Sequence, residues 1–323
     1  MPRHEATTAA LDSEEQEWWA DNGDLEEGFS WVQTPLARRV LRGHYLRRAR
    51  RFVGPGANVL ELGCGTGWLG LDLIRTADCR LLGIDSSPEQ IRRARAAASA
   101  AGLEARASYA VAGSPEAEAA AAGTRFDAVV THAFLHHLST REIESVLDES
   151  RSLLQPGGAL VVLEPVVGAE DPVSVASAQA TGGSDGWLRL QQRLRHLPRW
   201  SAEHRLRRMG PLELQTRRRL ESRPLPESPF GPSPKETPFR AGELESLLHD
   251  AGFSVAESAP VLCMSHLVAE DVLLAALSQP RFWTLATAPL LGMAHVADRR
   301  LLRSADRPPG LWVFTLYLCR RQH

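Results

Sequence analysis

An apolar run that ends in an acidic residue and three evenly spaced glycines says most about the fold of this chain. It reads Val59-Leu60-Glu61-Leu62-Gly63-Cys64-Gly65-Thr66-Gly67-Trp68-Leu69-Gly70. Because glycine lacks a Cβ, such a segment can turn sharply and let a ligand approach its backbone. A helical pattern follows from Leu69 to Ile74, so the free amides of its first turn would face the same ligand. The pattern predicts a strand, a ligand-binding turn and a helix.

Three further segments follow in order. Leu81-Leu82-Gly83-Ile84-Asp85 predicts a strand whose final acid lies 18 positions after Gly67. An acid there can accept hydrogen bonds from two ribose hydroxyls. Phe126 to His132 predicts a strand that enters a histidine-rich turn, and Leu153-Leu154-Gln155-Pro156-Gly157-Gly158 indicates the end of a helix and a turn.

Strand signals alternate with helical ones through the first half of the chain. The strands are expected near residues 58–62, 81–84, 107–111, 127–131 and 159–163. This alternation predicts an α/β fold, a parallel sheet with helices on both faces. Such sheets bind ligands at the carboxyl ends of their strands, where all the turns named above would lie.

Changes in composition divide the chain into four parts. Residues 1–51 are expected to form a helical N-terminal cap, and 52–165 an α/β core. Residues 166–236 are expected to form a lid insertion rich in arginine and proline, within which 185–223 holds eleven arginines and four acids. Residues 237–323 would complete the sheet, with a helical insertion over 270–303 and a final strand over 311–318.

Taken together, the four motifs resemble the class I S-adenosylmethionine-dependent methyltransferases. The resemblance covers roughly Phe52 to Pro165 and returns from Thr237 to Glu257. It implies a Rossmann-like sheet of seven strands, mostly parallel, whose last strand is antiparallel beside the sixth. It also implies a helix before the sixth strand, within Phe239 to Phe253, and S-adenosyl-L-methionine as cofactor.

The resemblance also implies roles for single residues. The glycines would carry the methionine portion of the cofactor, Glu61 would help to hold its ammonium, and Asp85 would bind its ribose. Many relatives place an acid after the third strand against the adenine; none is present over 110–115, so Ser114 or a backbone carbonyl would substitute. The cofactor-binding residues expected are Glu61, Gly63, Cys64, Gly65, Thr66, Gly67, Asp85, Ser86, Gln90, Ser114 and Thr131.

Three histidines follow the fourth strand. His132, His136 and His137 are candidates for a general base, since histidine titrates near neutral pH. In a helical segment His132 and His136 would share a face. Relatives similar to cyclopropane-forming and N-methylating enzymes carry a Glu-His pair at the positions of His136 and His137. The alternative is a structural role for all three histidines.

Other site chemistries are weaker. A nicotinamide dehydrogenase would need a G-x-G-x-x-G pattern, but Trp68 stands where its third glycine belongs. His132, His136 and Glu164 could in principle bind a metal, but no metal site is expected. The four cysteines show no metal-ligand spacing and are expected to be reduced thiols.

Composition limits the partners. A formal net charge of −2 gives no electrostatic case for a nucleic-acid partner. The apolar run from Phe282 to Ala297 is too short for a confident membrane span, and the acidic N-terminus shows no export signal, which favours a cytoplasmic protein. The oligomeric state is left open.

The sequence thus predicts a methyltransferase that acts on a small organic molecule, anionic or hydrophobic, in specialised natural-product biosynthesis. A lipid or quinone-like substrate is the second interpretation. A third is a non-methylating protein of the same fold that binds S-adenosylmethionine.

Overall fold

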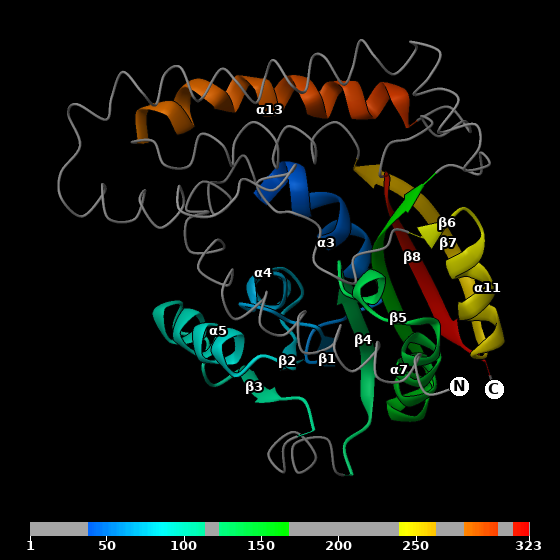
Figure 1. Cartoon of the computed structure of the whole chain (residues 1–323). Helices are drawn as coiled ribbons and strands as arrows, with labels where there is room; N and C mark the ends of the chain where they lie inside the picture. Colours follow the sequence, from blue (N-terminus) through cyan, green and yellow to red (C-terminus); the bar gives the residue numbers. More distant parts are fainter. Residues whose placement is uncertain (1–37, 114–122, 168–238, 263–280, 303–312, 323) are drawn as a thin grey trace, which may run out of the picture.

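The computed structural model describes residues 38–113, 123–167, 239–262, 281–302 and 313–322. Within these ranges, eight strands form one sheet in the order β3-β2-β1-β4-β5-β8-β7, and the short β6 pairs with β5 beside this path (Figure 1). Strands β3, β2, β1, β4 and β5 are parallel, whereas β8 runs antiparallel between β5 and β7. The strands are β1 (Asn58–Leu62), β2 (Arg80–Asp85), β3 (Ala107–Val111), β4 (Phe126–His132), β5 (Leu154–Val167), β6 (Phe239–Arg240), β7 (Phe253–Leu262) and β8 (Val313–Arg321).

Helices cover both faces of this sheet (Figure 1). Helices α3, α4 and α5 pack on one face, and α7 and α11 on the other. The described helices are α3 (Gly43–Ala49), α4 (Trp68–Ala77), α5 (Pro88–Ala100), α7 (Thr140–Leu153), α11 (Glu243–Asp250) and α13 (Arg281–Leu301), with a π-helical turn η1 (Arg38–Arg42) and a 3-10 turn η2 (Leu135–His137).

The starts of the helices follow from local chemistry. Ser87 caps α5 by accepting a hydrogen bond from the Gln90 amide, and Pro88 fits the first helical position because its missing N–H is not needed there. Helix α7 begins with a capping box, in which Ser139 and Glu142 each accept from the other's backbone amide. These caps end the loops that follow β2 and β4, and so fix the carboxyl edge of the sheet.

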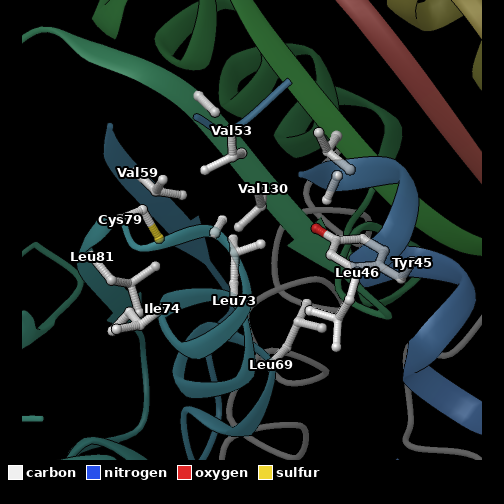
Figure 2. Packing of buried hydrophobic residues seen from close by; sticks show 14 of the residues in the cluster. Tyr45, Leu46, Val53, Val59, Leu69, Leu73, Ile74, Cys79, Leu81 and Val130 are labelled. Carbon is white, nitrogen blue, oxygen red and sulfur yellow. The ribbon is translucent and has the colours of Figure 1, made fainter. Parts of the chain in front are cut away.

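The sheet separates two apolar cores. On the face that α3, α4 and α5 cover, the inward-facing side chains of β1 and β4 pack against apolar side chains of these helices (Figure 2). On the other face, Leu60 and Val129 pack against α7 and α11. The largest fully buried side chains are Tyr45, Tyr317, Phe253, Leu60, Leu73, Ile74, Ile91, Leu135, Leu147, Leu154, Leu160 and Leu163.

The predicted sheet is confirmed with small differences. The antiparallel strand lies beside the predicted sixth strand, here β7, and α11 precedes β7 as expected. The eighth strand is the two-residue β6, too short to leave an alternating pattern in the sequence. Strand β5 begins already at Leu154, and the Pro156-Gly157-Gly158 turn lies inside it, where its pairing with β4 shifts register.

Most of the predicted cap and insertions lie outside the described residues. These include 1–37, with its tryptophans, and 168–238, with its arginines. Of the insertion over 270–303, residues 281–301 form the single helix α13, which contains Pro289. Within the described ranges, no helix has the length and apolar character needed to cross a membrane.

Candidate active site

The glycine turn has the backbone that only glycine adopts without strain. The φ angles of Gly63, Gly65 and Gly67 are +63°, +49° and +77°. Side chains with a Cβ rarely occupy this left-handed region. Gly67 is also the N-cap of α4, so the first amides of this helix lie at the turn. The alternating glycines therefore leave an open backbone at the carboxyl end of β1, as the sequence predicted.

An aromatic ring closes one side of this turn. A Cβ on Gly63 would lie 2.3 Å from Cδ2 of Phe134, so the ring of Phe134 packs directly on the glycine backbone. Phe134 belongs to the loop between β4 and η2. The contact joins the ends of two neighbouring strands, β1 and β4, at one edge of the sheet.

Asp85 ties the end of β2 to the same turn. Its Oδ2 accepts a hydrogen bond from the Gly65 amide at 2.9 Å, and its Oδ1 accepts one from the Ser87 amide at 2.9 Å. Burial raises the pKa of Asp85, although the amides of Ser87 and Gly65 and the charge of His137 act in the opposite direction. The half-buried carboxyl keeps lone pairs that could accept from a ligand's hydroxyls.

Glu61 lies in β1, beneath the turn, and is almost fully buried. Its Oε2 packs against α4, where a Cβ on Gly70 would come within 2.3 Å. Burial raises the pKa of Glu61 to about 8; the Gly70 amide lowers it in part and the charge of Asp85 raises it further. The structure thus does not give Glu61 the fully satisfied surroundings of a structural carboxylate, since Oε2 has no hydrogen-bond partner among the described residues.

The three histidines do not form one group. His132 ends strand β4, whereas His136 and His137 lie in η2, so the helix that would place His132 and His136 on one face does not form. The ring of His132 instead meets Tyr45 edge-on, with 6.0 Å between the ring centroids.

His136 is held by a buried carboxylate. Its Nδ1 lies 2.7 Å from Oε2 of Glu164, and the two side chains are 4% and 0% exposed. Oε1 of Glu164 accepts hydrogen bonds from the amides of Phe134 and Leu135, at 3.0 and 2.8 Å. Glu164 therefore shapes the whole loop after β4, including Ala133 with its left-handed φ of +51°.

The surroundings of Glu164 favour its charged form. Burial by itself would raise the pKa of Glu164, but His136 and the two backbone amides outweigh it, and the pKa is lowered. Because a carboxylate only accepts hydrogen bonds, Nδ1 of His136 carries the proton in this pair. His136 is thus committed to the fold of the loop.

His137 occupies the more open position. It is half-buried, and its ring stacks on that of His136 at a centroid distance of 4.0 Å. Its charge also lowers the pKa of Asp85, which places it on the side of the glycine turn. Of the three histidines, His137 is the one whose charge acts on Asp85.

The remaining residues expected to bind the cofactor differ in burial and in the face of the sheet on which they lie. Cys64 and Thr66 are buried within the turn, and Ser86 is exposed. Gln90 is buried on α5, and its Oε1 lacks a hydrogen-bond partner in the described part of the chain. Thr131 is buried but faces the side of the sheet opposite to Glu61, by the alternation of β4. Ser114 lies outside the described residues.

The structure separates His132 from the other two residues that could in principle bind a metal. The described residues contain no group of three or more His, Cys, Asp or Glu side chains suited to a metal ion. His136 pairs with Glu164, but His132 turns toward Tyr45.

Sequence reasoning missed several residues at this edge. Arg42 and Asp72 form a buried ion pair of 3.1 Å that joins η1 to α4, and the Arg42 guanidinium lies 5.8 Å from the ring centroid of Trp68. Tyr45 and Tyr109 were also missed. A signal existed for Tyr109, because it belongs to the same inward alternation of β3 as Ala107.

Comparison with known proteins agrees with this geometry. Residues 59–158 match the sequence model of a family described as a methyltransferase domain. The matched segment holds the glycine turn, Asp85 and all three histidines. This match to the family model confirms the expected resemblance to the class I methyltransferases and indicates S-adenosyl-L-methionine as the cofactor. It does not identify the subfamily.

A curated relative matches over a similar region. Carboxy-S-adenosyl-L-methionine synthase from Vibrio parahaemolyticus is 30% identical over 129 residues, which are 39% of this chain and 51% of that protein. The chain therefore spans about half the length of this relative.

Solved structures of similar shape cover more of the chain at lower identity. A cyclopropane synthase from Mycobacterium tuberculosis is 13% identical, with a TM-score of 0.49 over 87% of this chain and 84% of that one. A geranyl diphosphate C-methyltransferase from Streptomyces coelicolor, solved with Mg2+, geranyl diphosphate and S-adenosyl-L-homocysteine, is 12% identical, with a TM-score of 0.46 over 87% and 78%.

Proposed function

We propose that this protein transfers a methyl group from S-adenosyl-L-methionine to a small organic molecule in a specialised biosynthetic pathway. One observation carries most of the proposal: three left-handed glycines face an acid at the end of the next strand, joined to it by the Gly65–Asp85 hydrogen bond. This is the arrangement that a nucleoside with an attached amino acid needs, with an open backbone for one end and a carboxylate for the sugar.

The residues present fit this cofactor. Oδ1 and Oδ2 of Asp85 each accept one backbone amide, and a carboxylate has about four acceptor positions, so two remain for ribose hydroxyls. When bound, the cofactor supplies an activated methyl group. The chain would hold that group in line with the acceptor and exclude water, and Phe134 would form one wall of the site.

We assign the general base, where the acceptor needs one, to His137 rather than His136. A phenol, alcohol or activated carbon must lose a proton on methylation, whereas a carboxylate acceptor needs no base. His136 directs Nδ1 to Glu164 and is buried, but His137 is half-buried and its charge acts on Asp85. We therefore propose only His137 of the three histidines that the sequence offered as a base.

His137→Ala is expected to lower methyl transfer about 10²- to 10⁴-fold, the usual contribution of a general base. Affinity for S-adenosyl-L-homocysteine should change far less. Transfer would be measured with radiolabelled cofactor in a host small-molecule extract, and affinity by titration calorimetry. His132→Ala, at the end of β4, is the control. Full transfer by the His137 variant would assign this residue a structural role.

Asp85→Asn tests the cofactor site without any substrate. The amide keeps one acceptor oxygen but replaces the other with a donor that faces the Gly65 or Ser87 amide. We expect S-adenosyl-L-homocysteine to bind weaker by about 1–3 kcal/mol, the cost of unsatisfied polar contacts. Calorimetry with Asp127→Asn as control, at the far end of the sheet, would measure this. Equal affinity in wild type and variant would contradict the ribose assignment.

The main alternative is a protein that binds the cofactor without methylating anything. The similarity to a carboxy-S-adenosyl-L-methionine synthase gives this alternative its support. Binding of cofactor in calorimetry, with no incorporation of label into extracts from several growth conditions, would favour it. A lipid or quinone-like acceptor would instead appear as label in the organic phase.

A further inference from the structure

Two tyrosines lie beside Glu61 on the α4 face of the sheet. In register, Glu61 of β1 pairs with Gly83 of β2, and Gly83 pairs with Tyr109 of β3. A Cβ on Gly83 would lie 2.6 Å from Cδ1 of Tyr109, so the ring crosses β2 over this glycine. The Tyr109 hydroxyl reaches the glycine turn, where a Cβ on Gly67 would meet it at 2.6 Å.

Tyr45 approaches the same place from α3. Figure 2 shows its hydroxyl oxygen turned toward Val130 of the sheet, and Val130 is the register partner of Glu61 on β4. Burial raises the pKa of Tyr45, and the charge of Glu61 raises it further. The pKa of Tyr109 is raised by the same two causes. Both phenols therefore lie within electrostatic reach of one carboxyl group.

The polar ends of these three side chains are buried and unpaired. Tyr45, Glu61 and Tyr109 are 1%, 3% and 5% exposed. Within the described ranges, no hydrogen-bond partner is found for either hydroxyl oxygen or for Oε2 of Glu61. Burying such groups without partners costs free energy, and native proteins seldom do so. A phenol can donate or accept a hydrogen bond, whereas a carboxylate only accepts, so these three unpaired oxygens from three elements indicate a ligand group that can donate to the carboxylate.

We propose that Tyr45 and Tyr109 complete, with Glu61, a buried receptor for the primary ammonium of the cofactor's amino acid portion. An ammonium carries three N–H donors, and the cluster offers three unpaired oxygens. One of these belongs to a carboxyl group, which selects a cation over an anion. The inference rests on the proposed function and assigns the cofactor two residues outside the glycine turn.

The arrangement couples binding to the loss of a proton. The pKa of Glu61 is about 8, so this carboxyl is mostly protonated at pH 7 before the ligand enters. An ammonium favours the carboxylate, and the carboxyl proton leaves to solvent as the ion pair forms. Among the described residues, the titratable groups that interact electrostatically with Glu61 are Asp85 from β2, the two phenols, and Cys79, whose pKa burial raises to about 11. None of them supplies a compensating cation.

Two ligands that differ by the amino acid portion test the receptor. S-Adenosyl-L-homocysteine contains the ammonium, and 5′-methylthioadenosine lacks it. Calorimetry should show that Tyr45→Phe and Tyr109→Phe weaken the first about 3- to 15-fold and leave the second unchanged. Glu61→Gln should weaken the first more, about 10- to 150-fold. The chain has three tyrosines, and the third supplies the control: Tyr317→Phe, on the opposite face, should change neither affinity.

Each outcome decides between the inference and its premise. If neither compound binds the wild type, the proposed function fails. If S-adenosyl-L-homocysteine binds both phenylalanine variants as it binds the wild type, or if both ligands are weakened equally in variants that melt normally, the receptor is wrong. If the variants do not fold, proton release by the wild type on binding decides. Calorimetry at pH 7 in two buffers of different ionisation enthalpy should detect release of close to one proton, and no release overturns the inference.

Discussion

Gly63→Val is expected to abolish cofactor binding and to destabilise the protein by about 2–6 kcal/mol. Two costs add at this position. A β-branched residue is strained at a φ of +63°, which costs about 1–3 kcal/mol. Its Cβ would also lie 2.3 Å from the ring of Phe134, and displacing a packed ring costs about 1–3 kcal/mol more. Urea unfolding measures the loss of stability, and calorimetry with S-adenosyl-L-homocysteine measures binding.

Gly102→Val separates strain from contact. Gly102 has nearly the same φ, +65°, but no atom lies within 4 Å of the position of its Cβ. It follows α5, away from the turn. We therefore expect a loss of about 1–3 kcal/mol from strain alone, with cofactor affinity unchanged. Equal effects of the two substitutions on stability and on binding would show that Phe134 yields and that the close approach at Gly63 carries no function.

The glycine turn was predictable because its chemistry is local. The residue type alone indicates left-handed backbone at Gly63, Gly65 and Gly67. The acid at the end of the next strand can be found from its spacing along the chain. The antiparallel last strand beside the sixth followed from the resemblance, and β8 lies beside β7 as expected. These features depend on short segments, so one sequence contains the information that they need.

The partners of the site were harder to predict because they meet across the fold. Tyr109 lies within electrostatic reach of Glu61 because its ring crosses Gly83 in the register of three strands, and no spacing along the chain encodes that. The pairing of His136 with Glu164 joins residues 28 positions apart. The strand from Phe126 to His132 was predicted, and β4 has these bounds, but nothing in the sequence showed that Glu164 folds the next residues into a tight turn.

Glu164→Ala is expected to destabilise the protein by about 3–5 kcal/mol, the cost of breaking a buried ion-pairing group. The substitution removes the acceptor for His136 and for the amides of Phe134 and Leu135 at once. The loop would lose its left-handed turn at Ala133, and Phe134 would leave the glycine turn. Thermal unfolding should therefore show a lower midpoint, and affinity for S-adenosyl-L-homocysteine should fall with it.

The same carboxylate predicts an acid-sensitive stability. The pKa of Glu164 is lower in the folded protein than its ordinary value near 4.5. A group with a depressed folded pKa contributes its full stabilisation above the unfolded pKa and loses it as the pH falls through the folded one. Stability at neutral pH should thus stay level and decline below about pH 4.5. Unfolding midpoints measured from pH 3 to pH 7 would follow this decline.

Glu164→Gln removes the charge of this side chain but keeps its shape. The amide oxygen can still accept from Phe134 and Leu135, and its NH₂ can donate to His136 once the imidazole proton moves from Nδ1 to Nε2. We expect most of the stability to remain, but the acid decline due to this group to disappear. Glu257→Gln is the matched control, because Glu257 also has a lowered pKa but lies at a partly exposed pair with Arg48 and Arg51, where ion pairs contribute at most about 1 kcal/mol. If Glu164→Gln declined in acid as steeply as the wild type, the Glu164–His136 pair would not be what holds the loop against the glycine turn.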